Sequence, residues 1–332
     1  VIGSGATAVT LVPALAQRGA RVTLLQRSPS YLLALPSHDG LARFLKHVLP
    51  ARAAARIVRA KNIALGLVMF KLSRAYPARM RGWLTGLVRR ALPGQDVARH
   101  FSPRYNPWEQ RLCIVPDGDL FDALRSGGAE IVTDTIERFT AQGVRLASGR
   151  ELEADIIVTA TGLEVSVLGE VAVSVDGRPV DFAQTLAYKA MMFSGVPNLV
   201  STFGYTNASW TLKADLTAAY TCRLLTYMDR HGYVAVAPEH DPKMATRPFI
   251  DFSSGYIQRA IHKMPQQGAR APWRLHQNYL RDFLALRYGR LDDGTLAFTR
   301  AADAAAQSPT ASSMRTSSNS VPPGTRRNDT TR

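Results

Sequence analysis

The stretch that decides the fold is Val-Ile-Gly-Ser-Gly-Ala-Thr-Ala, residues 1–8. Its apolar start leads into a glycine-rich turn, and helix-forming residues follow from Leu11 to Gln17. Gly19 then ends the predicted helix, and residues 21–25 have the composition of a second strand. Strand, glycine turn, helix and strand in this order are typical of a nucleotide-binding unit. The sequence therefore predicts an α/β fold with a doubly wound parallel sheet.

The turn has small residues at the positions where a dinucleotide needs them. Gly3 permits the tight turn, Gly5 lets the backbone approach a pyrophosphate, and Ala8 permits close packing of the helix on the strand. The amides and the dipole at the helix N-terminus would then face the phosphates. A glycine pattern alone also occurs in ordinary tight turns, so a chance match is the alternative.

The residues after the second strand indicate which dinucleotide is expected. An NAD-binding unit has Asp or Glu here to hold the ribose hydroxyls, whereas this chain has Arg27 and Ser28. A guanidinium and a hydroxyl bind a 2′-phosphate through charge-assisted hydrogen bonds, and a carboxylate would repel it. We therefore expect NADP(H). The alternative is a solvated arginine at a strand end.

A third candidate element lies much further along the chain. Residues 155–160, Asp-Ile-Ile-Val-Thr-Ala, are predicted to form a buried strand. Thr161 and Gly162 follow at its end, which in a doubly wound sheet faces the ligand crevice. We expect these two residues to contribute to cofactor binding, and an ordinary strand-to-turn transition is the alternative.

The net charge of the 332-residue chain is +15, but most of it is local. From Leu41 to Arg111 there are 15 Lys and Arg against two acids, which gives +13. The helical spacing of apolar residues in this segment predicts basic amphipathic helices. Three interpretations are open: a solvated insertion, adsorption of residues 41–91 to an anionic membrane surface, and nucleic-acid binding. No nucleic-acid-binding motif accompanies the charge, so we expect no nucleic-acid partner.

Several classes of protein are disfavoured by composition. No apolar run approaches the ~20 residues of a membrane span, and the seven histidines lack metal-ligand spacing, so no metal is expected. Cys113 and Cys222 are the only cysteines, which favours a cytoplasmic location, with the inner face of the cell membrane as a variant. Residues 301–332 are predicted to be a disordered tail. Because the chain begins directly at a strand end, we expect that an N-terminal part of a longer protein precedes Val1.

Five segments together resemble the FAD-containing monooxygenases of the Baeyer–Villiger type, in particular their ethionamide-activating branch. They are residues 1–13, 24–29, 103–113, 160–162 and 203–215. The resemblance covers about residues 1–300. It implies an NADP-binding domain over residues 1–162, with residues 41–112 as the basic helical insertion. In this family the NADP domain is inserted within the FAD domain, so residues 163–300 would be the part of the FAD domain that follows the insertion.

The same resemblance implies FAD and NADP as cofactors and assigns roles to further residues. It implies that Ser4 and Thr7 of the glycine turn contribute to NADP binding. Arg111 matches the catalytic arginine that faces flavin and nicotinamide, and Asn207 and Thr211 match the segment beside the isoalloxazine. The implied reaction uses NADPH and dioxygen. It inserts one oxygen atom into a ketone, giving an ester, or adds it to a thioether or thioamide sulfur, through a flavin peroxide. No N-terminal FAD fingerprint is present, so the alternative is an NADP(H)-binding module without oxygenase activity, associated with a membrane surface.

Overall fold

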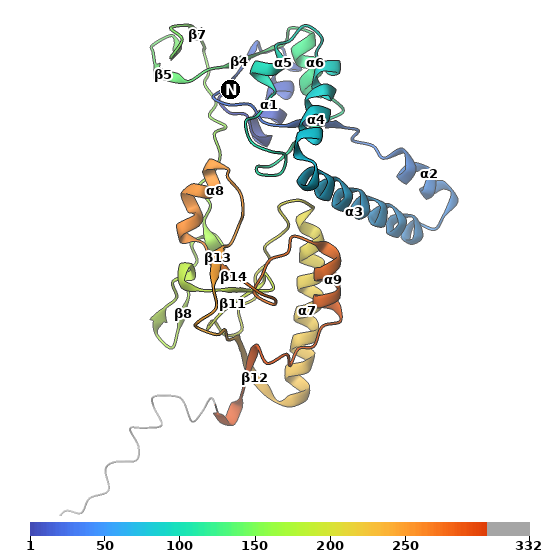
Figure 1. The fold of residues 1–332 in the computed structure, drawn as a ribbon, viewed down its shortest axis with the longest axis vertical. Coiled ribbons are helices and arrows are strands. Elements are labelled where there is room, and N and C mark those ends of the chain that lie inside the picture. The colour runs from blue at the N-terminus through green and yellow to red at the C-terminus, as the bar shows by residue number, and fades with distance from the viewer. Residues whose placement is uncertain (304–332) are drawn as a thin grey trace, which may run out of the picture.

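The computed structural model describes residues 1–303, so nearly all of the predicted tail at 301–332 lies outside the described residues. Two lobes are visible in Figure 1. The first contains the elements from α1 to β7, and the second contains those from the middle of the chain to the last described strand. An extended segment of the chain joins the two lobes.

The first lobe is organised around parallel β-pairing beside the glycine turn. Strand β1 (Val22–Gln26) pairs in parallel with β4 (Ala129–Thr133). Ile2 forms parallel bridges to Leu25 on one side and to Thr159 on the other. The resulting order, Thr159, Ile2, β1 and β4, is that of a doubly wound nucleotide-binding sheet, which confirms the predicted α/β fold.

Helix α1 (Ala6–Ala16) covers one face of this sheet together with α6 (Asp119–Arg125). The helix begins earlier than predicted because Gly5 has an extended backbone and serves as its N-cap. The buried side chains between helix and sheet are mostly aliphatic. They include Val9, Val12, Leu24, Val115 and Leu120. Burial of such side chains contributes about 1.5–3 kcal/mol each relative to exposure.

The prediction of a buried strand over residues 155–160 is wrong. The Ile2 amide does donate to the Val158 carbonyl at 2.8 Å, but only Thr159 forms a bridge and no strand follows. Ile156 is 81% exposed. The segment pairs through Ile2, and Ala160 packs against the core of the lobe. Ile156 and Ile157 are exposed, so a sequence pattern typical of a core strand lies at an exposed edge.

The helical insertion is present as predicted. Its helices are α2 (Gly40–Val48), α3 (Ala51–Ala75), α4 (Pro77–Ala91) and α5 (Val97–His100). Helix α4 buries Leu84 and Val88, and α5 buries Val97, whereas α2 buries no side chain. The insertion leaves and returns through one parallel pair, β2 (Leu32–Leu35) with β3 (Cys113–Pro116). No helix among residues 1–303 is long and apolar enough to cross a membrane.

A three-stranded antiparallel sheet completes the first lobe. Its strands are β5 (Ile136–Phe139), β6 (Gly143–Leu146) and β7 (Glu151–Glu153). The hairpin edge that the sequence predicts near Val144 and Gly149 is therefore confirmed.

The second lobe is a mixture of short strands and three helices. Its elements are η1 (Val167–Glu170), β8 (Ser174–Val175), β9 (Arg178–Pro179), η2 (Phe182–Gln184), β10 (Ala187–Tyr188), β11 (Met192–Phe193), α7 (Trp210–His231), β12 (Tyr233–Pro238), β13 (Thr246–Pro248), α8 (Gly255–Ala260), η3 (Ile261–Lys263), β14 (Gln266–Gly268), α9 (Tyr279–Arg287) and β15 (Leu296–Arg300). Helices α7 and α9 lie side by side (Figure 1). Strand β15 follows α9 and pairs antiparallel with β12.

Candidate functional site

The glycine turn is packed as tightly as a nucleotide-binding turn requires. Gly3 has a φ of +144°, and a Cβ built on it would lie 2.2 Å from the Ala160 carbonyl oxygen. Gly5 is exposed and has open space around its Cα, while Ala8 is fully buried against the sheet. The first glycine thus permits close chain approach, and the second leaves its surface accessible to a ligand.

The N-terminus of α1 offers amide groups that no side chain caps. Thr7 in its first turn is exposed, and Ser4 lies just before the helix. The Ser30 hydroxyl donates to the Ser4 hydroxyl at 3.1 Å, which brings the loop after β1 against the turn. Uncapped amides and the helix dipole favour an anion at this position. The contribution of Ser30 was not predicted, since no local pattern relates it to the turn.

Arg27 and Ser28 lie directly after β1, and both are exposed. The strand end is fixed by the buried Gln26, whose amide donates to the His100 carbonyl at 2.8 Å and to Thr133 Oγ1 at 2.9 Å. Among the described residues, no ion pair involves Arg27. Because β1 is hydrogen-bonded to the strand that enters the glycine turn, this guanidinium stands at the same sheet edge as the α1 amides.

Arg111 follows a loop that is rigidly hydrogen-bonded. The Asn106 amide N–H and side-chain Nδ2 each donate to one carboxylate oxygen of Glu109 at 2.8 Å. These two bonds lower the pKa of Glu109. Arg81 of α4 donates to Asn106 Oδ1 at 2.9 Å and so ties the loop to the insertion. Sequence reasoning missed these supports, although the Asn-Pro-Trp-Glu spacing is that of a side-chain-capped turn.

The same loop contacts both the insertion and the second lobe. Trp108 has a left-handed backbone, with φ 69°, and its ring meets the Phe70 ring of α3 edge-on at 5.7 Å. The Ser253 amide and hydroxyl donate to the Glu109 carbonyl at 3.1 and 3.2 Å. Arg111 emerges exposed from this clamped loop. A fixed loop holds a charged side chain in a restricted region, which is what electrostatic catalysis needs.

Cys113, two residues after Arg111, is a packed residue as predicted. Its thiol is buried, and burial raises its pKa to about 11. A thiol with this pKa is a poor nucleophile near neutral pH.

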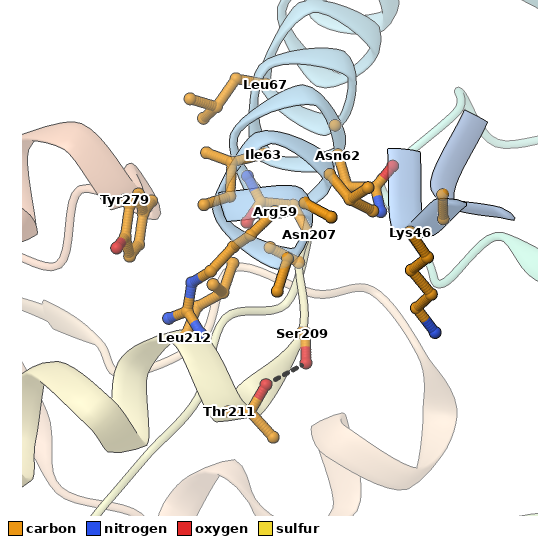
Figure 2. Close-up of a pocket in the computed structure, with 16 residues that line it drawn as sticks. Lys46, Arg59, Asn62, Ile63, Leu67, Asn207, Ser209, Thr211, Leu212 and Tyr279 are labelled. Carbon is orange, nitrogen blue, oxygen red and sulfur yellow. Dashed lines mark hydrogen bonds between the residues drawn. The ribbon is translucent and has the colours of Figure 1, made fainter. Parts of the chain in front are cut away.

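A cavity of about 650 Å³ lies between the helical insertion and the segment before α7. Figure 2 shows Asn207 and Thr211 beside α3 in this cavity. The Asn207 side-chain amide donates to the Gln277 carbonyl at 3.0 Å, and the hydroxyls of Thr211 and Ser209 lie 2.8 Å apart. Most of the remaining wall is aliphatic. It includes Val58, Ile63, Leu67 and Leu212, with Asn62 and Tyr279 as polar members.

One ion pair links the two walls of this cavity. Arg59 of α3 donates to Asp215 of α7 at 2.6 Å, and this bond raises the pKa of Arg59. Lys46 lies at another part of the wall (Figure 2). The cavity therefore combines an apolar interior with cationic groups, which suits an apolar molecule that carries a polar acceptor.

The remaining predicted residues lie where the chain passes between the lobes. Thr161 and Gly162 are exposed, and Gly162 has a φ of +106° with Tyr256 of α8 packed close to it. Trp210 contacts Phe203 and does not line the large cavity. Arg111 is also absent from the lining. The structure thus groups the predicted residues into the sheet edge of the first lobe and the cavity between insertion and second lobe.

Solved structures of similar fold define the class of the chain; no family model matches it. An oxidized steroid monooxygenase bound to NADP aligns with a TM-score of 0.59 at 17% identity, over 90% of this chain and 66% of that one. A cyclohexanone monooxygenase mutant from Rhodococcus sp. Phi1 bound to NADP+ aligns with a TM-score of 0.56 at 14% identity, over the same shares. The fold is therefore that of the flavin monooxygenases, with Rossmann-type nucleotide domains.

Sequence comparison with curated proteins gives more similar relatives than the solved structures do. The chain is 54% identical over 303 residues to the FAD-containing monooxygenase EthA of Mycobacterium tuberculosis (strain ATCC 25618 / H37Rv), which is 90% of this chain and 62% of that protein. It is 48% identical over 306 residues to the probable FAD-binding monooxygenase AlmA of Acinetobacter baylyi, 91% of this chain and 61% of that protein. The chain is thus a homologue of the FAD-containing monooxygenases, as the motifs predicted, and it spans less than two thirds of the length of these relatives.

Proposed function

We propose that this chain forms the NADP-binding and flavin-facing part of an NADPH- and FAD-dependent monooxygenase that transfers one oxygen atom of dioxygen to a ketone or a sulfur substrate. The observation that carries the proposal is the sheet edge where Gly3 packs against Ala160 beside the uncapped α1 and the unpaired Arg27. In this assignment residues 1–162 are the NADP domain, with its insertion at 41–112, and residues 163–300 belong to the FAD domain.

The sheet edge fits NADP(H) in shape and charge. Gly5 has no neighbour within 4 Å of a built Cβ, so a pyrophosphate has room to approach the backbone and the α1 amides. Arg27 and Ser28 are exposed next to it and would hold the 2′-phosphate. An adjacent carboxylate, which would favour NAD instead, is absent from both positions.

The second group of residues is assigned to FAD and the substrate. Asn207 and Thr211 at the large cavity, with Thr161 and Gly162 at the lobe connection, would contact the flavin, which supplies the oxygen-activating chemistry when bound. The guanidinium of Arg111 would supply a fixed positive charge for negative oxygen that develops during the reaction. Arginine keeps this charge at every working pH, because a guanidinium is not deprotonated in proteins.

Nucleotide preference tests the sheet edge. The chain is titrated with NADPH and with NADH, followed by nicotinamide fluorescence, for the wild type, Arg27→Gln and Arg21→Gln. A charged hydrogen bond contributes about 1.5–3 kcal/mol, so Arg27→Gln should weaken NADPH binding about 10- to 100-fold and leave NADH binding nearly unchanged. Arg21 lies exposed at the other end of the strand and is the matched control. Equal affinity of the wild type for both nucleotides contradicts the assignment.

Oxygenation tests Arg111. With added FAD, substrate-dependent NADPH oxidation and product formation are measured for the wild type, Arg111→Ala and Arg104→Ala, an exposed arginine in the same segment. Loss of a preorganised cation should lower turnover about 10²- to 10³-fold while NADPH affinity is kept. Normal turnover by Arg111→Ala overturns its role. A wild-type chain that binds NADPH but oxidises no substrate supports the alternative of an NADP(H)-binding module.

Peripheral membrane contact is a second proposal, favoured by the outer surface of α2 and α3. Residues 41–75 contain eight Lys and Arg and no acid. Phe44 is 60% exposed and Val48 57%, and α3 adds further exposed aliphatic residues. Basic helices with exposed apolar residues adsorb to anionic lipid.

Liposome flotation tests this contact. The wild type should float with phosphatidylglycerol vesicles and not with phosphatidylcholine vesicles, and high salt should weaken the binding. Phe44→Ser with Val48→Ser should abolish flotation, whereas Leu280→Ser with Leu284→Ser, on exposed positions of α9, should not. Equal flotation of both double variants contradicts the proposed surface.

A further inference from the structure

A second cavity, of about 240 Å³, lies within the second lobe. It shares no lining residue with the 650 Å³ cavity. Gln277 lies between them: it lines the smaller cavity, and its carbonyl accepts the hydrogen bond from Asn207, which lines the larger one. The smaller cavity is therefore a separate space that touches the proposed flavin-facing segment through one residue.

Lys213 of α7 is buried in the wall of this cavity, with only 4% of its side chain exposed. Its ammonium donates to Asp282 Oδ2 at 2.8 Å. The Tyr205 hydroxyl donates to the same oxygen at 2.7 Å. An ammonium has three donors, and the hydrogen bond to Asp282 uses one of them.

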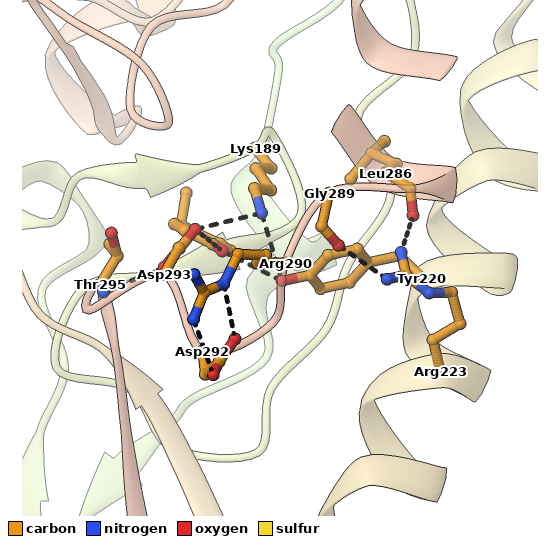
Figure 3. A network of polar contacts seen from close by, with 10 residues as sticks. Lys189, Tyr220, Arg223, Leu286, Gly289, Arg290, Asp292, Asp293 and Thr295 are labelled. Atoms are coloured by element: carbon orange, nitrogen blue, oxygen red, sulfur yellow. Dashed lines mark hydrogen bonds and ion pairs between the residues drawn. The ribbon is translucent and has the colours of Figure 1, made fainter. Parts of the chain in front are cut away.

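Lys189 is the second buried cation, with 10% of its side chain exposed. Its ammonium lies 4.7 Å from the ring centroids of both Tyr188 and Tyr220. Its polar contacts are long: 3.4 Å to the Tyr220 hydroxyl and 3.5 Å to Asp293 Oδ2 (Figure 3). Burial lowers the pKa of Lys189 and of Lys213, because desolvation of each ammonium outweighs the attraction of its carboxylate partner.

The charged groups of the lining are unbalanced. Each of the two buried lysines has a carboxylate partner, Asp282 for Lys213 and Asp293 for Lys189. The exposed arginines at the rim, Arg274 and Arg281, take part in no ion pair among the described residues. His276 lies beside Arg281, and burial and the neighbouring arginines lower its pKa. The rest of the wall is largely apolar, with Phe203, Leu275, Ala285 and Leu286. The excess positive charge of the lining therefore belongs to the two rim arginines, which can form charge-assisted hydrogen bonds to an anion.

The backbone of the lining is also unusual. Lys189, Ala190 and Gln277 have left-handed φ values of 51°, 59° and 48°. Each such non-glycine residue is strained, and strain of this kind concentrates at ligand sites. The presence of three such residues around one small cavity indicates that the fold maintains the shape of this cavity despite the backbone strain.

We propose that this cavity binds a small organic carboxylate, with the carboxylate between Lys213 and the rim arginines and the apolar body against Phe203 and Leu286. Charge-assisted bonds to guanidinium and ammonium groups give the affinity for the carboxylate. The apolar wall requires a hydrocarbon or aromatic body rather than a bare inorganic anion. The site does not depend on the function proposed above.

Calorimetric titration of the 332-residue chain tests the proposal with three probes: benzoate, benzyl alcohol and inorganic phosphate. Benzoate should bind, while benzyl alcohol, which has the ring without the charge, and phosphate, which has the charge without the ring, should bind at least ten-fold more weakly. Arg281→Gln should weaken benzoate binding about ten-fold. Arg287→Gln, an exposed position on the same helix that does not line the cavity, should leave it unchanged.

Three results would overturn the proposal. They are the absence of benzoate binding, binding of benzyl alcohol or phosphate as tight as that of benzoate, and an equal effect of the two arginine substitutions. Circular dichroism and thermal melting of each variant separate loss of binding from loss of folding, because both substituted arginines are exposed and neither should change the melting temperature by more than a few degrees.

Discussion

The carbonyl oxygen of Ala160 lies 2.2 Å from the position that a Cβ on Gly3 would occupy. The two residues are more than 150 positions apart, yet they are joined through Ile2, whose carbonyl accepts the Ala160 amide at 2.7 Å. A backbone oxygen cannot move aside as a flexible side chain can. The glycine turn is therefore held closed by a distant segment of the chain.

Gly3→Ala should destabilise the chain and abolish NADPH binding. The added methyl group meets backbone, and the φ of +144° is strained for alanine, so we expect a loss of about 2–4 kcal/mol in the free energy of unfolding. Gly5→Ala is the control, because no atom lies within 4 Å of its built Cβ, and it should cost less than about 1 kcal/mol. Urea denaturation measures both, and equal costs would contradict this account of the turn.

The loop before Arg111 should loosen in acid. Hydrogen bonds from Asn106 lower the pKa of Glu109 below its ordinary 4.5. A depressed folded-state pKa gives stability that is present above pH 4.5 and is lost as pH falls through the folded value. The group is largely solvated, so the contribution is below about 1 kcal/mol.

Glu109→Gln should therefore reduce stability at pH 7, and this cost should shrink as the pH falls below 4.5 toward 3. Thermal melting across this pH range measures the difference, and Glu153→Gln, outside the loop, is the control variant. If the stability difference between the wild type and Glu109→Gln grew as the pH fell, the hydrogen bonds of Asn106 to the Glu109 carboxylate would not explain it.

The two cysteines should react at very different rates. Burial raises the pKa of Cys113 to about 11, while Cys222 is exposed on α7. Iodoacetamide at pH 8 should label Cys222 within minutes and Cys113 only on unfolding, since the thiolate is the reactive form. Peptide mass spectrometry before and after adding denaturant gives both rates. Rapid labelling of Cys113 in the folded chain would contradict its packing beside the glycine turn.

Asp215→Asn should have a small, salt-dependent effect on stability. The Arg59–Asp215 pair spans the large cavity, but both side chains are about half exposed. Exposed pairs contribute about 0–1 kcal/mol and are screened by salt. Unfolding at 20 mM and at 1 M NaCl, with Asp229→Asn on the same helix as control, measures the contribution. A cost that persists at high salt would mean that the pair is not acting as an exposed ion pair.

The sequence predicted the elements that depend on local patterns. The βαβ unit, the basic helical insertion and the α/β class follow from spacing within short segments, and the structure confirms them. The prediction of a buried strand at residues 155–160 was wrong. An apolar composition indicates that a strand could lie in a core, but it does not indicate whether other elements cover that strand.

Contacts between distant residues were beyond local patterns. Ser30 meets Ser4, Arg81 meets Asn106, and Lys213 meets Asp282, 69 positions away. A single lysine in a helix is usually solvated, so nothing in the residues around Lys213 indicated that it is buried. The roles of Arg111, Asn207 and the other matched residues remain predictions that rest on the family resemblance.

The connection at Gly162 makes the large cavity an adjustable space. Its φ of +106° lies in the region that only glycine adopts easily, and it sits where the chain crosses between lobes. Across the cavity, α3 and α7 are linked by an exposed ion pair, which is weak. Ile63 and Leu212 line the cavity from α3 and α7. We therefore expect the size of molecule that the cavity accepts to depend on the angle between the lobes as well as on the side chains of its wall.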